Sequence, residues 1–347
     1  MTRFVIKRLL LTILVIVGAA FVIFSVMYFV PGDPAKLLVE ATATPADIEA
    51  MRHKLGLDQS YIEQLGNFMF NTFIKFDLGD SWFRSTTVIE GLAERLPRTL
   101  ILGIITSLVI IIVGVPLGVT AATHQGKARD RGLIVGSMVF ISIPEFWLAL
   151  LLILLFSSKL GWLPSMGIES WKCYILPVIS GSVVGICNVA RQTRASVLDV
   201  FRADFIVTAR AKGLKERAVV YKHMLPNALI PVITIAGKYF AQCIGGTIVL
   251  EKIFSFPGVG LYLNDAIGQR DYPVIRGCVI IMAAFTAIVM LLVDLAYGFV
   301  DPRIKAQYIN SGAKKGKKSS NGHRGHGHHG GHGSHDKGET VEGGALA

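Results

Sequence analysis

The residues best suited to metal chemistry are the histidines of HRGHGHHGGHGSH, residues 323–335. They are His323, His326, His328, His329, His332 and His335. Imidazole is a good ligand for Ni²⁺, Zn²⁺ and Cu²⁺, and the intervening glycines would allow several rings to reach one ion. The alternatives are a solvated tail that is rich in histidine by composition and an expression tag, although the irregular spacing differs from a standard run. One hypothesis is therefore that the tail binds a metal ion, Ni²⁺, through these histidines.

Ionisable residues within the long apolar runs are few, and Glu145 in SIPEFWLALLL is the clearest case. A carboxylate within a membrane span is a functional candidate, so Glu145 is predicted to line a solute pathway. The alternative is that it begins a helix after a break at Pro144. Because a proton- or sodium-coupled carrier usually needs several such groups, their scarcity favours a transporter driven by another subunit, while a secondary carrier stays open.

The sequence contains none of the common nucleotide-binding or hydrolytic motifs. The Gly-Lys pairs lack the other residues of a G-x-x-x-x-G-K-[ST] loop, and neither H-E-x-x-H nor G-x-S-x-G is present. The four cysteines lie in or beside apolar runs without C-x-x-C spacing, and we expect small buried side chains. We therefore expect no catalysis by this chain and no cofactor bound to it.

Composition indicates that the elements positioning these residues are membrane helices. The 347 residues are 52% hydrophobic and only 17% charged, whereas a soluble domain carries roughly a quarter charged residues. A helical span needs about 20 apolar residues. We predict an all-α integral membrane protein with six spans: Leu9–Val30, Thr99–Thr123, Gly132–Ser158, Tyr174–Val189, Ile230–Glu251 and Val274–Val300.

The distribution of lysine and arginine predicts the orientation. The N-terminus, the loops 124–131 and 191–222 and the segment after 301 are rich in basic residues, whereas the intervening loops are not. Basic loops stay in the cytosol, so both termini are predicted to be cytosolic. The net charge of +11 then reflects orientation, and no nucleic-acid partner is expected. The first apolar run is too long for the hydrophobic part of a signal peptide. Residues 1–30 are therefore interpreted as a cytosolic start followed by a retained first span.

Besides the first span, two regions lie outside the predicted five-span transmembrane core of residues 99–303. Residues 31–98 are interpreted as an extracytosolic subdomain with a helix in TPADIEAMRHKLGL, where Thr44 is the N-cap, Pro45 and Asp47 occupy the first turn and Gly56 ends the helix. Residues 304–347 are Gly-, Lys- and His-rich and are expected to be a disordered cytosolic tail. A metal-binding tail on that side would capture ions after passage.

The largest cytosolic loop, residues 191–228, contains ARAKGLKERAVVYKHMLPNA. We predict two short helices, the first ending at Gly213 and the second at Pro226. Such a compact pair fits a groove on a cytosolic partner. The alternative is an amphipathic segment lying on anionic membrane lipid.

This loop resembles the E-A-A…G…I-x-L-P loop of bacterial ABC importer permeases through Ala209, Ala211, Gly213 and Leu225–Pro226. Ala209 replaces the usual Glu and His223 the usual Ile. Both departures are similar to the oligopeptide/dipeptide/nickel permease family. The same family is indicated by PGDPA (31–35), LGLDQ (55–59), DLGDS (77–81), RLPRTL (95–100), SIPEFWLALLL (142–152), GWLP (161–164), IFSFPGVG (253–260), RDYPVI (270–275) and DPR (301–303).

The resemblance implies an ABC importer permease fold in a bacterial inner membrane, and a set of partners. These are a second, homologous permease, two cytosolic ATPase subunits that bind ATP, and an extracytosolic substrate-binding protein. It places the ATPase-coupling loop at Ala209, Arg210, Ala211, Lys212, Gly213, Leu214, His223, Leu225 and Pro226. Arg210, Lys212 and Lys215 would either pair with acidic ATPase residues or merely mark the cytosolic side.

The substrate expected from the resemblance is nickel, free or chelated, or a short peptide. The short connection GWLPSMGIESWKCYILP and the histidine tail favour nickel, and a dipeptide or oligopeptide importer is the alternative. The segments Pro257–Gly260 and Asp271–Pro273 are expected to shape an outer turn or gate. A membrane scaffold without transport activity is a further alternative.

Overall fold

The computed structural model describes residues 2–40, 42–242, 245 and 247–300. Regular structure in these residues is helical, apart from one isolated bridge between Asp80 and Thr87. The α-helices are α1 Thr2–Phe29, α2 Pro34–Leu37, α3 Pro45–Lys54, α4 Tyr61–Phe73, α5 Val88–Thr123, α6 Ala128–Ser142, α7 Glu145–Leu152, α8 Ile175–Phe201, α9 Asp204–Ala211, α10 Glu216–Ala218, α11 Leu225–Ala241, α12 Ile248–Ile253, α13 Val259–Gln269 and α14 Tyr272–Val300. Two π-helical segments, η1 Ile153–Lys159 and η3 Val219–Met224, and a 3₁₀ turn, η2 Trp171–Tyr174, complete the described elements.

The described part of the chain has four helices that are long and apolar enough to cross a membrane, or six if each of two bent pairs is one span. The four are Val5–Phe29, Val88–Thr123, Trp171–Phe201 and Tyr272–Ala296. Apolar side chains on their outer surfaces are exposed, such as Leu14 (65%) and Ile112 (66%). Lipid tails accommodate such surfaces, so the fold is that of a multi-pass membrane protein.

The predicted span Gly132–Ser158 is not one straight helix. It consists of α6 and α7–η1, which are bent by 92° at the break between them. Ile143 is extended, with φ −81° and ψ 122°. The ring of Pro144 disfavours a helical conformation at the preceding residue, which is the physical reason for the break.

The predicted span Ile230–Glu251 was wrong at both ends. Its long helix, α11, begins at Leu225 and ends at Ala241, and Glu251 belongs to the separate short helix α12. Pro226 does not end a helix either, because it lies in the first turn of α11, directly after the π-helical segment η3. Proline lacks the N–H that would continue the helical hydrogen bonding, and the irregular π-helical turn directly before it is where a helix accommodates such an interruption.

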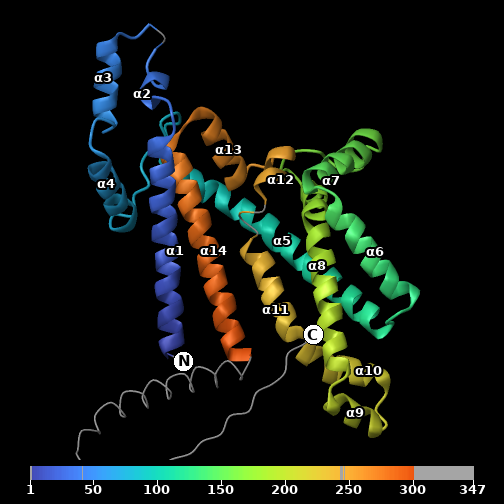
Figure 1. Cartoon of the computed structure of the whole chain (residues 1–347). Coiled ribbons are helices and arrows are strands. Elements are labelled where there is room, and N and C mark those ends of the chain that lie inside the picture. The colour runs from blue at the N-terminus through green and yellow to red at the C-terminus, as the bar shows by residue number, and fades with distance from the viewer. Residues whose placement is uncertain (1, 41, 243–244, 246, 301–347) are drawn as a thin grey trace, which may run out of the picture. The chain divides into compact units, whose positions relative to one another are not determined.

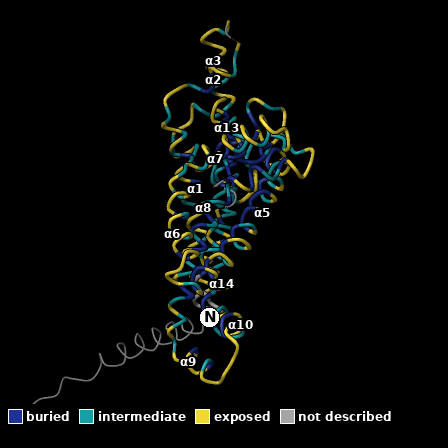
Figure 2. Tube along the Cα trace, turned by 90° about the vertical axis from the view of Figure 1, so that its right-hand side faces the viewer, coloured by how far each residue is buried: buried dark blue, intermediate teal, exposed yellow. Residues whose placement is uncertain are grey.

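The spans form a bundle in which α5 packs along α8, as Figure 1 shows. The contact is close, since a Cβ on Gly118 of α5 would lie only 2.4 Å from the carbonyl oxygen of Ala190 on α8. Small residues allow this approach of two membrane helices. Buried positions in Figure 2 concentrate around α5 and α13, whereas α6 and the end that carries α9 are largely exposed.

The helices of residues 31–87 and the cytosolic loop lie at opposite ends of the bundle (Figure 1). Helix α3 has the predicted bounds: Thr44 and Asp47 form a capping box, Pro45 is the first residue, and Gly56 follows the end with φ +68°. The N-terminus of α1 lies at the same end as α9 and α10. That arrangement agrees with the orientation inferred from the basic loops.

Candidate functional site

The loop of residues 191–228, which the sequence predicts to be cytosolic, is built on a compact apolar core. Buried side chains from the ends of α5 and α8 pack with those of α9, η3 and α11, and Ile206, Val219 and Met224 have no exposed surface. The core comprises Val119, Ala122, Val197, Ile206, Ala209, Val219, Val220, Met224 and Ala228. Because packed interiors deform little, α9 and η3 are fixed to the ends of the long helices.

Gly213 occupies the turn between the two helical segments. As predicted, α9 ends just before it, and its φ of +76° is the left-handed conformation that glycine adopts without steric cost. A Cβ at Gly213 would meet nothing within 4 Å. Ala211, Lys212 and Leu214 beside it are exposed. The turn is therefore open to a partner, and backbone conformation alone accounts for the glycine.

The predicted coupling residues divide into an exposed and an enclosed group. Ala209 is 6% exposed and belongs to the apolar core, so it does not face a partner. His223 and Leu225 are half-buried, and the His223 carbonyl accepts a hydrogen bond of 2.9 Å from Asn227 Nδ2. Pro226 is exposed. The structure thus brings the nine residues into one loop, but only part of the set forms its surface.

Arg210 has its charge partner within this chain. Its Nε and Nη2 donate to Glu216 at 3.2 and 2.7 Å, and its guanidinium carbon lies 4.1 Å from the centroid of the Phe201 ring. The hydrogen bonds to Glu216 raise the pKa of Arg210 above its ordinary value. Arg210 therefore joins α9 to α10 directly across the turn.

The loop surface combines exposed apolar side chains with lysines and arginines. Phe205, Val207, Leu214 and Tyr221 are 47%, 59%, 41% and 61% exposed. Lys212 and Lys215 are exposed too, and no ion pair involves them in the described residues. A large exposed apolar surface on a folded loop is typical of a protein interaction site. The sequence had pointed to the basic residues, but had not singled out these apolar ones.

Glu145 is the first residue of α7, directly after the break at Pro144. Its Oε1 lies 3.3 Å from the position that a Cβ on Gly181 of α8 would take, and no hydrogen bond to its carboxylate occurs in the described residues. The break at Pro144 is confirmed, and the pathway role of Glu145 stays a prediction. Asp294, near the other end of the bundle, pairs with Arg8 at 2.6 Å and joins α14 to α1.

Glu251 is a buried carboxylate that the sequence analysis missed. It has no exposed surface, and four donors surround it. The hydroxyls of Thr99 and Thr247 donate to Oε1 at 2.8 and 3.1 Å, and the backbone N–H groups of Gly260 and Leu261 donate to Oε2 at 2.7 and 3.0 Å. We call these five residues the Glu251 network. It fixes the start of α13 to α5.

The glycines of FPGVG allow this approach. A Cβ on Gly258 would lie 2.4 Å from Glu251 Oε2, and one on Gly260 would lie 2.6 Å from the Cα of Ile248. The segment thus shapes a turn around a carboxylate, in keeping with the structural role expected for Pro257–Gly260. The sequence signal that could have identified Glu251 is a glutamate shortly before a Pro-Gly turn.

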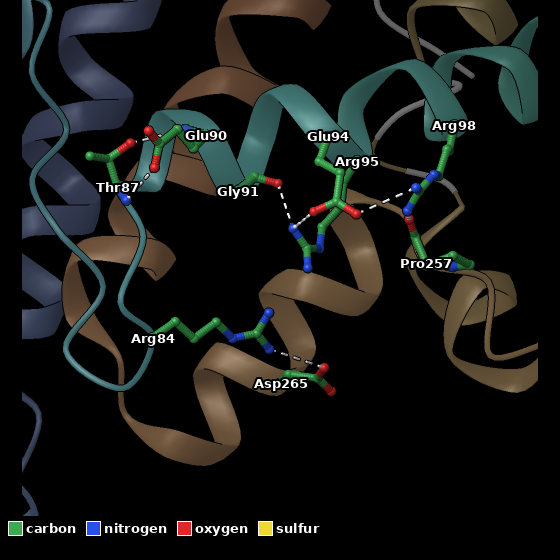
Figure 3. A network of polar contacts seen from close by, with 9 residues as sticks. All are labelled: Arg84, Thr87, Glu90, Gly91, Glu94, Arg95, Arg98, Pro257 and Asp265. Atoms are coloured by element: carbon green, nitrogen blue, oxygen red, sulfur yellow. Dashed lines mark hydrogen bonds and ion pairs between the residues drawn. The ribbon is translucent and has the colours of Figure 1, made fainter.

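A network of arginines links the beginning of α5 and the loop before it to α13 and the turn before it (Figure 3). Glu94 accepts hydrogen bonds from Arg95 at 3.2 Å and from Arg98 at 3.4 Å, and Arg98 also donates to the Pro257 carbonyl at 3.4 Å. Arg84 pairs with Asp265 of α13 at 3.8 Å. The network thus holds α13 against the beginning of α5.

Asp271 performs a similar task for the loop before α5. It is 1% exposed and accepts hydrogen bonds from the Ser81 hydroxyl at 2.5 Å and the Trp82 N–H at 3.2 Å. This carboxylate ties the DLGDS segment to the start of α14, which is in keeping with the expectation that Asp271–Pro273 shape an outer turn.

The predicted metal ligands of the tail, residues 323–335, lie outside the described residues. Within residues 2–40, 42–242, 245 and 247–300, no group of three or more His, Cys, Asp or Glu side chains is arranged to hold a metal ion.

Two family models match the chain. Residues 1–103 match the N-terminal region of binding-protein-dependent transport system membrane components. Residues 114–306 match the inner membrane component of binding-protein-dependent transport systems.

Three curated relatives with similar sequences are named for peptide substrates. A putative peptide transport system permease of Brucella abortus is 39% identical over 313 residues, covering 88% of this chain and 99% of that protein. An oligopeptide transport system permease of Bacillus subtilis is 37% identical over 320 residues, covering 88% and 100%. A glutathione transport system permease of Escherichia coli is 39% identical over 305 residues, covering 88% and 99%.

A solved structure has a similar fold. The inward-facing MetNI methionine ABC transporter matches with a TM-score of 0.53 at 18% identity, covering 61% of this chain and 97% of that chain. At this identity the match concerns the fold alone. The fold, the two family models and the full-length relatives agree, and the chain belongs to the family of inner membrane components of binding-protein-dependent transport systems, as a permease of an ABC importer.

Proposed function

We propose that this permease forms, with a second homologous permease, the route by which short peptides enter the cytosol, and that two separate ATPase subunits drive it. The observation that carries the proposal is the exposed surface of α9 and η3, mounted on a buried core that reaches α5, α8 and α11. The names of the relatives support peptides as the substrate class. An extracytosolic binding protein would deliver the peptide.

The mechanism that we propose is transmission of ATPase movement through the loop. An ATPase groove would hold the turn at Ala211–Leu214 and the apolar residues Phe205 and Tyr221. When two ATPases close on ATP, the loop moves with them, and its buried core moves the ends of α5 and α8 together. Packed interfaces switch between discrete arrangements, so the motion reaches the far side of the membrane as a rigid-body rotation.

The test is a charge placed on the loop surface. Ala211→Glu should leave the permease inserted and assembled but abolish uptake, because a carboxylate in an apolar groove costs several kcal/mol of binding, roughly 2–5. Ala128→Glu, on the exposed surface of the other basic loop, is the matched control and should retain uptake. ATPase subunits that still co-purify with Ala211→Glu and hydrolyse ATP in response to substrate would refute the coupling role.

Nickel, free or chelated, remains a second candidate substrate. The observations that favour it are the short connection at residues 161–177 and the six histidines of the tail. Uptake of a radiolabelled dipeptide and of ⁶³Ni²⁺ by cells expressing the complete transporter would separate the two candidates. We expect dipeptide uptake that unlabelled Ni²⁺ does not inhibit.

A further inference from the structure

A cavity of about 800 Å³ lies away from the coupling loop, between the outer end of α1, helix α4 and the start of α14. Phe24 of α1, Asn67 and Phe68 of α4 and Arg276 of α14 line it. The two networks that hold α13 against α5 are not part of its wall. The loop through which we propose that transport is driven lies at the other end of the bundle, so the cavity is separate from it.

Arg276 is a half-buried cation that forms no ion pair in the described residues, although the buried carboxylate of Asp271 acts on its charge from beyond ion-pair distance. Its Nε donates to the Tyr272 carbonyl at 3.3 Å, and its guanidinium carbon lies 5.5 and 5.0 Å from the ring centroids of Phe24 and Phe68. These contacts orient the group without forming an ion pair. A guanidinium removed from water is stabilised best by an anion that accepts two parallel hydrogen bonds.

The two carboxylates that line the cavity, Asp33 and Asp77, make no ion pair with Arg276 in the described residues. Asp33 accepts two hydrogen bonds from Arg52, at 3.1 and 2.6 Å, so this pair balances itself. Asp77 accepts a hydrogen bond of 2.8 Å from the Gly79 N–H, and Lys54 adds a second cation. Among the described lining residues, the positive charge therefore exceeds the negative charge, and the cavity favours an anionic ligand.

Helix α4 has the character of an interfacial membrane helix. Large apolar side chains on and just after it are exposed: Ile62 (77%), Phe70 (52%), Ile74 (65%) and Phe76 (75%). Helix α4 lies beside the upper part of α1 in Figure 1, and the Tyr61 hydroxyl is 2.8 Å from Ser25 Oγ of α1. An amphipathic helix beside the end of a span lies at the level of the lipid head groups.

Aromatic side chains mark the same level on α1. Tyr28 packs against Phe29 and Tyr61, with ring centroids 5.2 and 5.0 Å apart. Phe29 is 73% exposed at the end of the helix. Aromatic residues of this kind gather where a membrane span meets water. The cavity thus opens where the phosphate groups of the outer leaflet are found.

We propose that the cavity binds the head group of an anionic phospholipid from the outer leaflet. The lipid phosphate pairs with Arg276, and the acyl chains run along the exposed apolar side chains of α4 and α1. Such a lipid supplies a direct ion-pair partner for Arg276 and covers the apolar face of α4 in one step. The proposal does not depend on which solute the permease carries.

The test measures phospholipid retained by the intact transporter. The complete complex, reconstituted in nanodiscs of phosphatidylglycerol and phosphatidylethanolamine, is extracted in mild detergent, and the lipid that remains is quantified by mass spectrometry. In Arg276→Gln, retained phosphatidylglycerol should fall roughly tenfold, as expected for loss of a charge-assisted pair. Arg276→Lys should fall less, and Arg129→Gln, which removes an exposed arginine on the cytosolic side, should retain lipid as the unmodified protein does.

Two further measurements keep the proposal falsifiable if Arg276→Gln fails to assemble. A spin label at Phe70→Cys in the otherwise unmodified complex should be more accessible to lipid-soluble oxygen than to a water-soluble relaxant. Inorganic phosphate at 50 mM should not displace the retained lipid. The proposal is overturned by equal lipid retention in Arg276→Gln, by displacement with inorganic phosphate, or by a spin label shielded from lipid by the second permease.

Discussion

Glu251 provides the sharpest test of how α13 is held. Replacement by alanine would remove the acceptor of four hydrogen bonds at a site without exposed surface. The hydroxyls of Thr99 and Thr247 can rotate toward other acceptors, but the N–H groups of Gly260 and Leu261 cannot. Each unsatisfied buried donor costs about 1–3 kcal/mol, so the two N–H groups alone cost about 2–6 kcal/mol.

Glutamine is the informative comparison at this position. Its amide oxygen can accept from the N–H groups of Gly260 and Leu261, while its NH₂ group donates to the hydroxyls of Thr99 and Thr247, which accept as well as donate. The volume is unchanged, and the charge is lost. We expect Glu251→Gln to cost about 1–2 kcal/mol, well below the alanine variant.

The assay is the thermal unfolding midpoint of the purified complex, followed by peptide uptake in proteoliposomes. Glu251→Ala should lower the midpoint clearly and reduce uptake, because α13 is no longer fixed to α5, and Glu251→Gln should lie close to the unmodified protein in both. If alanine and glutamine behave alike, the four hydrogen bonds do not hold this turn and the reasoning is refuted.

Changes at three other places test separate parts of the molecule. Glu145→Gln should change peptide uptake while leaving assembly intact if the residue lines the pathway; normal uptake by Glu145→Ala would return it to a structural role. Arg210→Glu should reduce coupling, and the double variant Arg210→Glu/Glu216→Arg should restore uptake, since the pair lies within this chain; failure of the swap would show that Arg210 has a partner outside it. Because this pair is largely exposed, Arg210→Ala should cost no more than about 1 kcal/mol of stability. Truncation after Gln307 should remove Ni²⁺ binding by calorimetry and leave import largely intact; loss of uptake by an assembled, truncated complex would contradict a role after passage.

The features that the sequence predicted well are set by local contacts. Thr44, Pro45, Asp47 and Gly56 define α3 because each acts within one helical turn of the others. The long apolar helices follow from hydropathy for the same reason, since each segment must satisfy its own backbone in lipid.

The features that it missed depend on residues far apart in the chain. Hydropathy places Glu251 at the end of a span. The hydrogen-bond donors that stabilise its buried carboxylate come from residue 99 as well as from residues 247–261. Pro144 and Pro226 are equally strong signals in sequence, yet one lies at a 92° bend and the other lies in the first turn of a continuing helix. The difference is whether the preceding residues are already helical, which packing decides.

Helix α5 contacts both regions that matter for transport. Its last turns contribute Val119 and Ala122 to the core under the cytosolic loop, and its first half contributes Thr99 to the Glu251 network. With 36 residues at 1.5 Å each, it spans about 54 Å. A displacement of the loop therefore reaches α13 through one element and needs no chain of separate contacts. Arg276 lies outside this route, so loss of lipid there and loss of coupling at Ala211 should be separable in the same assay.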